Sequence, residues 1–145
     1  MRFELVDRVV ERSAERIVTL KHVSLAEEYL QDHFPGFPVL PGVLMVEAMV
    51  QAARALLDDR GGARLVLGQV RALKYGRFVR PGDTLRVEVV LGGTGTGAGQ
   101  DSSFELRGQG SVLGAVAGLE EPGGLAVSGR FTLRPVRLGS CRPVC

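Results

Sequence analysis

The chain lacks the features that mark several large classes of protein. It contains no tryptophan, and its two cysteines, Cys141 and Cys145, both stand in the last five residues. Without cysteines in the body of the chain no disulfide framework can form, which fits a reducing compartment. Apolar runs are far shorter than the roughly 20 residues of a membrane-spanning helix, and no apolar signal segment is recognisable near Met1. We therefore expect a cytoplasmic location.

A strong charge of either sign is also missing. Eighteen lysines and arginines face sixteen acidic residues, so the net charge is only +2. So small a surplus does not indicate a nucleic-acid partner. A chain of 145 residues with 45% hydrophobic residues fits one globular domain. We expect this domain over 1–137 and a flexible tail over 138–145, and we predict no metal site at the cysteine pair.

The residue pattern predicts an α+β fold with one long helix. Residues 42–59 form the helix candidate, and Glu47 and Gln51 are the only polar side chains over its positions 43–53. A helix that is apolar nearly all round is typically buried. Strands are predicted over 5–11, 15–23, 63–78, 84–91, 103–117 and 125–136, with a Gly-rich loop over 92–99. A curled antiparallel sheet of five to six strands wrapped around the helix is the expected architecture.

Glu47 stands inside the apolar part of this helix. Its neighbours three and four residues away are Val43, Leu44, Val50 and Gln51, so no local ion pair is expected. Desolvation favours the protonated form of an unpaired carboxyl group, and a neutral carboxyl can act as a general acid. The alternative is that Glu47 reaches solvent through a gap or bonds a backbone group across a dimer interface.

His33 opens a loop with proline at positions 35, 38 and 41, which is stiff and cannot be helical. A histidine in a rigid loop suits a general base, because a neutral imidazole is available near pH 7. The alternative is a histidine that is satisfied in a surface turn. Gly42 follows at the helix N-terminus, where free N–H groups can polarise a carbonyl as an oxyanion hole does.

A base, an acid and an oxyanion donor are the groups needed to remove a proton α to a carbonyl and to expel a β-hydroxyl. A loop and more than one turn of helix separate His33 from Glu47 in the sequence. We therefore expect the two side chains to meet across two subunits, and we predict a dimer.

The segment from His33 to Gln51 reads HFPGFPVLPGVLMVEAMVQ. It resembles the active-site segment of bacterial 3-hydroxyacyl-[acyl-carrier-protein] dehydratases of the FabZ type, which are hotdog folds. The likeness includes the spacing from His to Glu, all three prolines and the Glu-Ala-Met-x-Gln end. A weaker likeness follows at the Arg80–Leu85 turn and strand, so the resemblance covers about residues 3–91.

The resemblance implies a function and a role for each site residue. His33 takes the α proton of a (3R)-3-hydroxyacyl thioester, and Glu47 of a partner subunit protonates the leaving hydroxyl. The Gly42 amide holds the thioester carbonyl, and the Val39 carbonyl orients the His33 ring. The product is a trans-2-enoyl thioester, formed in fatty-acid or related acyl-chain synthesis without a metal or redox cofactor. FabA-type relatives, which also isomerise the double bond, carry Asp at the position of Glu47, so dehydration alone is favoured.

The resemblance also implies a tunnel for the acyl chain and a basic docking surface for the acidic acyl carrier protein. The candidates for the tunnel are Phe37, Leu40, Met45, Met49, Tyr75 and Phe78. The candidates for carrier docking are Arg71, Lys74, Arg77 and Arg80. Core packing explains the first group as readily, and ordinary solvated positions the second. The assembly is expected to be a homodimer or a trimer of dimers.

Parts of the chain depart from the family pattern. The family has a basic-Phe-basic run after the helix, whereas this chain has Lys74-Tyr75-Gly76. The stretches 92–99, 114–124 and the tail from Leu138 also differ. These departures concern substrate length, tunnel shape and carrier docking, and they are compatible with a specialised pathway.

Two other functions are compatible with the same fold. Acyl thioesterases use a helix carboxylate, but the His-Phe-Pro loop is not their usual signature. A non-catalytic hotdog subunit could serve as a partner in a hetero-oligomer. The presence of His33, Glu47 and Gly42 together argues against that, because an inactive copy need not keep them.

Overall fold

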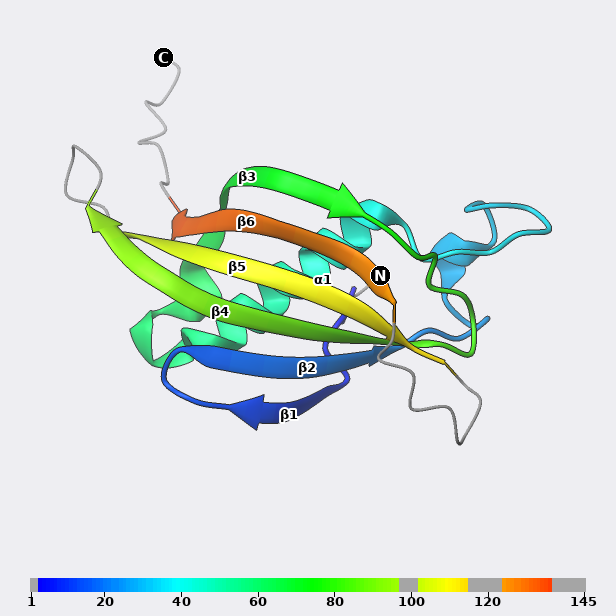
Figure 1. Cartoon of the computed structure of the whole chain (residues 1–145), viewed down its shortest axis with the longest axis horizontal. Helices are drawn as coiled ribbons and strands as arrows, with labels where there is room; N and C mark the ends of the chain where they lie inside the picture. The colour runs from blue at the N-terminus through cyan, green and yellow to red at the C-terminus, as the bar shows by residue number, and fades with distance from the viewer. Residues whose placement is uncertain (1–2, 97–101, 115–123, 137–145) are drawn as a thin grey trace, which may run out of the picture.

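A computed structural model describes residues 3–96, 102–114 and 124–136, and shows one long helix packed on a six-stranded sheet (Figure 1). The helix α1 spans Gly42–Leu56. The strands are β1 (Arg8–Arg12), β2 (Arg16–His22), β3 (Leu65–Tyr75), β4 (Thr84–Thr96), β5 (Ser102–Leu113) and β6 (Leu125–Pro135). Short 3-10 turns occur at Glu28–Leu30, Asp58–Arg60 and Gly62–Arg64.

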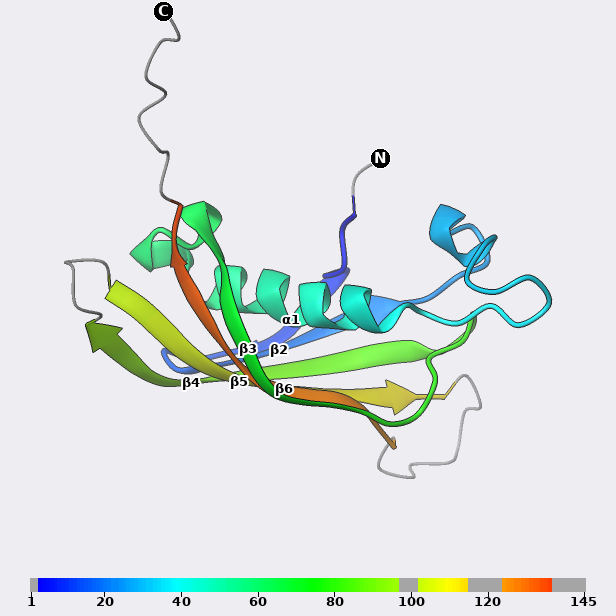
Figure 2. The same ribbon diagram turned by 90° about the horizontal axis from the view of Figure 1, so that it is seen from above.

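The sheet order is β1-β2-β4-β5-β6-β3, and every neighbouring pair is antiparallel. The sheet curves past α1, which lies along one of its faces (Figure 2). The predicted architecture of one long helix wrapped by a curled antiparallel sheet is confirmed. Strands β1 and β3 form the two edges of the sheet.

Glycines on β5 let the helix lie close to the sheet. A side chain on Gly108 would place its Cβ 2.3 Å from the Met49 Sδ atom of α1. A Cβ on Gly110 would similarly lie 2.8 Å from the Cγ1 atom of Val127 on β6. Met49 can therefore be fully buried, and the core forms between α1 and the concave face of the sheet.

The structure corrects three sequence-based expectations about the elements. The helix ends at Leu56, and a 3-10 turn at Asp58–Arg60 replaces its last predicted turn. The Gly-rich stretch is not a loop over its whole length, because β4 runs on to Thr96 and pairs with β5 there. Pairing requires only backbone groups, which glycine supplies as well as other residues.

The third correction concerns the burial of α1. Val43 is 72% exposed, and Glu47, Gln51 and Arg54 are half-buried along the same stripe of the helix. The helix is thus buried on the face toward the sheet, and its opposite face is partly accessible to solvent. In the described part of the chain no helix is long and apolar enough to cross a membrane. The predicted tail at 138–145, with both cysteines, lies outside the described residues.

Candidate active site

The proline-rich loop holds the His33 ring by its own backbone. The Nδ1 atom lies 2.9 Å from the Val39 carbonyl oxygen, and the Val39 amide donates back to the His33 carbonyl at 2.9 Å. The Leu40 amide donates to the Val79 carbonyl at 2.8 Å, which ties the loop to the segment after β3. Because a carbonyl oxygen only accepts, the neutral ring carries its hydrogen on Nδ1. The Nε2 atom keeps its lone pair and can accept a proton.

Gly42 begins α1 immediately after this loop. The amides of Leu44 and Met45 donate to the Pro41 carbonyl at 3.0 and 3.2 Å. The amides of Gly42 and Val43 have no acceptor within the helix and can meet a ligand oxygen. The helix dipole places positive partial charge at the same point.

The Tyr75 ring packs directly on Gly42. A Cβ at this position would lie 2.7 Å from Cε1 of the ring and 3.1 Å from its hydroxyl oxygen. Only glycine leaves room for the ring in this place. Tyr75 itself is 53% exposed, so the end of β3 forms one wall of the surface around the helix N-terminus.

Glu47 lies one turn along α1 and is not isolated. The carboxylate oxygen Oε1 accepts a hydrogen bond from Gln51 Nε2 at 3.0 Å. It also lies 3.8 Å from Nη1 of Arg54, and the Glu47 side chain is 37% exposed. The residues three and four positions from Glu47 supply no ion pair, as expected, but Arg54 two helical turns away does. The spacing 47, 51, 54 along one stripe was the signal that could have shown it.

Gln51 connects Glu47 to the N-terminal segment. Its Oε1 accepts from the Leu5 amide at 2.9 Å, and its Nε2 donates to the Phe3 carbonyl at 2.8 Å. These two backbone bonds fix which end of the amide faces Glu47, so Nε2 must be the group that approaches the carboxylate. The sequence alone marks Gln51 as polar and gives it no role.

The structure does not bring His33 and Glu47 together within one chain. His33 pairs with Val39, and Glu47 pairs with Gln51 and Arg54, with no hydrogen bond between the two among the described residues. No group of three or more potential metal ligands occurs in the described part of the chain.

The tunnel candidates fall into two groups. Leu40, Met45 and Met49 are buried in the core, whereas Phe37, Tyr75 and Phe78 are exposed. The docking candidates differ as well. The guanidinium of Arg80 lies 4.6 Å above the Phe37 ring, whereas Arg71 stands on β3 with Lys74 three residues further on. The roles of all these residues stay predictions.

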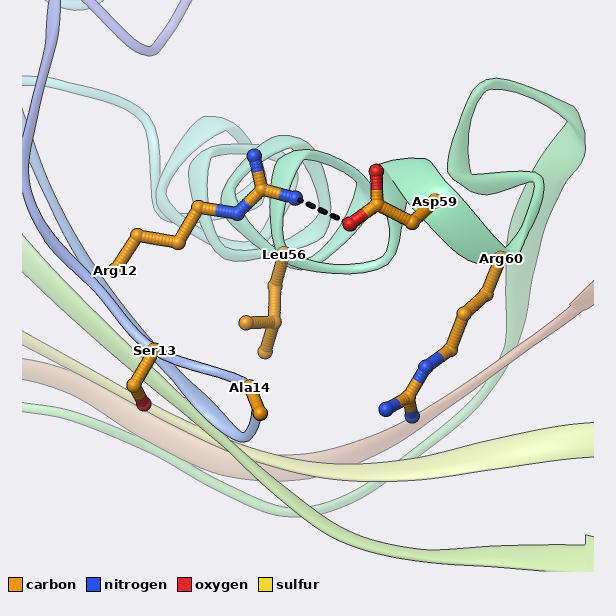
Figure 3. A pocket seen from close by; sticks show the side chains of 6 residues that line it. All are labelled: Arg12, Ser13, Ala14, Leu56, Asp59 and Arg60. Carbon is orange, nitrogen blue, oxygen red and sulfur yellow. Dashed lines mark ion pairs between the residues drawn. The ribbon is translucent and has the colours of Figure 1, made fainter.

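A cleft of about 340 Å³ lies at the far end of α1 (Figure 3). It is lined by Arg12, Ser13, Ala14, Leu56, Asp59 and Arg60. Arg12 Nη2 lies 3.6 Å from Asp59 Oδ2 across it. None of the predicted site residues lines this cleft, so it is separate from the site at the helix N-terminus.

Solved structures share the arrangement of one helix on this sheet. The dehydratase heterocomplex ApeI:P from Xenorhabdus doucetiae matches with a TM-score of 0.62 at 16% identity, over 92% of this chain and 99% of that one. A hypothetical thioesterase with coenzyme A from Streptococcus pneumoniae matches with a TM-score of 0.63 at 11% identity, over 89% and 84%. These likenesses define a hotdog fold, as predicted.

Sequence matches establish the family of this chain. Residues 1–113 match the FabA-like domain, and the chain belongs to this family. It is 42% identical over 125 residues to the FabZ 3-hydroxyacyl-[acyl-carrier-protein] dehydratase of Thermomicrobium roseum, covering 79% of this chain and 83% of that one. The predicted FabZ-type resemblance is confirmed.

Other relatives match over a shorter stretch. The FabZ protein of Oenococcus oeni is 53% identical over 91 residues, which is 60% of this chain and 66% of that protein. The FabZ protein of Koribacter versatilis is 43% identical over 90 residues, 59% and 58% of the two chains. The chain thus aligns with less than two thirds of the length of these two relatives.

Proposed function

We propose that this protein dehydrates (3R)-3-hydroxyacyl thioesters on acyl carrier protein to trans-2-enoyl thioesters. The observation that carries the proposal is the hydrogen bond between His33 Nδ1 and the Val39 carbonyl. It leaves a basic Nε2 on a rigid loop that ends at the open amides of α1. Named FabZ relatives with this activity support it, and the chemistry uses no metal or redox cofactor. A cytoplasmic location and a place in fatty-acid or related acyl-chain synthesis belong to the same proposal.

In the proposed mechanism the substrate carbonyl binds at the Gly42 amide, where positive partial charge stabilises an enolate oxygen. The α C–H bond breaks as His33 Nε2 takes the proton. The C–O bond to the β-hydroxyl breaks as Glu47 gives its proton to the leaving oxygen, and one water departs. The site is reset when the imidazolium proton passes to the Glu47 carboxylate through solvent.

A homodimer, alone or within a trimer of dimers, completes the proposed site. His33 and Glu47 have separate partners within the chain, which supports a second group supplied by another copy. The open stripe of α1 and the long edge strand β3, with exposed Leu67 and Leu73, are surfaces that a second copy would cover. Exposed strand edges with apolar side chains favour pairing with another chain.

The test is hydration of a short trans-2-enoyl thioester, followed by the loss of enoyl absorbance. We expect turnover by the wild type, and a loss of about 10²–10⁴-fold in both His33→Ala and Glu47→Ala, as for a removed base or acid. His22→Ala and Glu28→Ala are matched controls, because His22 bonds Thr84 on β4 and Glu28 is exposed outside the site.

Two outcomes would contradict the proposal. Hydrolysis of an acyl thioester with no hydration of the enoyl substrate would indicate a thioesterase. A wild type inactive on both enoyl-pantetheine and enoyl-carrier substrates would indicate a non-catalytic partner subunit.

A further inference from the structure

Tyr75 is the last residue of β3, and its ring lies on the first residue of α1 (Figure 1). The backbone around this ring is anchored to the sheet. Tyr75 pairs with Val127 of β6, and the next amide, that of Gly76, donates to the Ala126 carbonyl at 2.9 Å. The position of the ring relative to Gly42 is therefore set by the pairing of the strands.

The Tyr75 hydroxyl lies close to the Gly42 amide. The hydroxyl oxygen is 3.1 Å from the point where a Cβ of Gly42 would be. That point is two covalent bonds of about 1.5 Å from the amide nitrogen, so the oxygen and the nitrogen are at most about 5.6 Å apart. Hydrogen bonds from N–H and O–H groups are about 3.0 and 2.8 Å long, so two such donors can share one acceptor when they are up to about 5.8 Å apart. The distance thus allows both groups to bind the same oxygen atom.

The hydroxyl also lies toward the correct end of the helix. Because Cα–Cβ bonds in a helix tilt toward its N-terminus, the ring edge beside the Cβ position of Gly42 is displaced toward the free amides. No hydrogen bond joins the Tyr75 hydroxyl to another group in the described part of the chain. A phenolic O–H is a donor, and tyrosine is among the side chains that form oxyanion holes. An available donor therefore stands beside the amides that begin α1.

We infer that the Tyr75 hydroxyl is a second donor to the thioester carbonyl oxygen, beside the Gly42 amide. This inference rests on the proposed function. As His33 takes the α proton, the electron pair of the C–H bond moves into the enolate, and negative charge develops on the carbonyl oxygen. Two donors that are in place before the reaction stabilise this charge better than one. Tyr75 keeps its proton throughout, so the reaction stays balanced without a further group.

The inferred role depends on the hydroxyl and not on the ring. In the basic-Phe-basic run of the family pattern the aromatic residue is Phe, whereas this chain has Tyr75. Phe would still pack on Gly42 but has no donor. The sequence predicts Tyr75 only as a candidate for the acyl tunnel, a role for which the ring is sufficient. The two roles therefore give different expectations for Tyr75→Phe.

The experiment compares Tyr75→Phe with the wild type in the hydration of trans-2-enoyl thioesters of pantetheine. A removed oxyanion donor costs about 10²–10³-fold in an enclosed site, and Tyr75 is exposed, so we expect kcat and kcat/KM to fall together by about 10–10²-fold. The melting temperature should not change, because the hydroxyl has no partner among the described residues. Tyr29→Phe is the matched control. It removes the hydroxyl of the only other tyrosine, which packs on Phe3, and should keep wild-type activity.

Two further readouts separate a hydrogen-bond donor from a tunnel wall. The factor lost in Tyr75→Phe should be the same for crotonyl and trans-2-decenoyl thioesters, since only the carbonyl meets the hydroxyl. Butyryl pantetheine, which has neither a β-hydroxyl nor a double bond, binds without reacting and reports on the carbonyl by infrared spectroscopy. Its carbonyl stretching frequency should be higher on Tyr75→Phe than on the wild type, because a hydrogen bond weakens the C=O bond.

Unchanged kcat in Tyr75→Phe would overturn the inference. A loss that grows with chain length, with equal carbonyl frequencies on the two proteins, would also overturn it and assign Tyr75 to the tunnel wall. If the wild type binds these thioesters but hydrates none, the proposed function fails, and the butyryl carbonyl frequency tests the inference by itself. A higher frequency on the variant then supports it, and equal frequencies contradict it. A wild type that neither hydrates nor binds a thioester would overturn both.

Discussion

Single residues determine the geometry around the start of α1. His33 is oriented by one carbonyl, Gly42 leaves space for one ring, and Glu47 is held by one amide. Each depends on a short contact that a single substitution removes. Gln51 is the most connected of them, because it bonds the backbone of the N-terminal segment as well as the carboxylate.

We predict that Gln51→Ala lowers both stability and activity. The change leaves the amide of the buried Leu5 without its acceptor, and each lost hydrogen bond costs about 0.5–1.5 kcal/mol in the free energy of unfolding. Denaturant unfolding and enoyl hydration would measure the two effects. Gln31→Ala, at an exposed position before the loop, is the control. Retention of wild-type kcat would show that Glu47 needs no positioning by Gln51.

A close contact between two elements holds the end of β3 against β6. Gly76 lets β3 end against β6, since its amide donates to the Ala126 carbonyl at 2.9 Å. A Cβ at this position would lie 2.2 Å from the Leu125 carbonyl oxygen. The glycine that stands here in place of the family's basic residue thus allows two backbones to approach closely.

We therefore expect Gly76→Ala to be clearly destabilising, by roughly 1–3 kcal/mol as for other overpacked sites. A backbone carbonyl cannot rotate away as a flexible side chain can. Gly93→Ala on β4 is the matched control, because a Cβ there meets nothing within 4 Å. Equal melting temperatures for the two variants would contradict this account of Gly76.

Glu88 links β4 to β2 and makes stability depend on pH. The hydrogen bond from Arg16 lowers the pKa of Glu88 below its ordinary value of 4.5, and Arg86 adds to the effect. A carboxyl whose pKa is lower in the folded state stabilises the fold above its unfolded pKa, and this stabilisation is lost as pH falls through the folded pKa.

The melting temperature should accordingly decrease as the pH falls below 4.5, with part of the decrease due to Glu88. Thermal unfolding of Glu88→Gln across this range should show a weaker dependence on pH than the wild type. Glu105→Gln serves as the control, because Glu105 stands on the neighbouring strand β5, on the same face of the sheet as Glu88. The same slope for wild type and Glu88→Gln would show that the Arg16 contact is not maintained in solution.

On the scale of the whole molecule, the proposed function leaves the site incomplete in one chain. The open stripe of α1, the edge of β3 and the exposed Tyr75 and Phe78 border the same region. A second copy would bury these surfaces and supply the missing partner for each half of the site. The proposed function therefore links activity to the oligomeric state.

Light scattering coupled to size-exclusion chromatography should give a mass of two or six chains. Mixing His33→Ala with Glu47→Ala should restore part of the activity, because some mixed dimers contain one site with both groups intact. Active protein that is monomeric at the assay concentration would refute the shared site.

Local sequence determined the elements and the composition of the site. Apolar periodicity located α1 and the strands, and three prolines with a glycine defined the loop and the helix start. Tertiary structure alone decided which of these residues meet. Tyr75 on Gly42, and Gln51 on Phe3 and Leu5, join residues far apart in the chain. Side-chain periodicity encodes the face of an element, but strand register and helix placement arise from packing over the whole core.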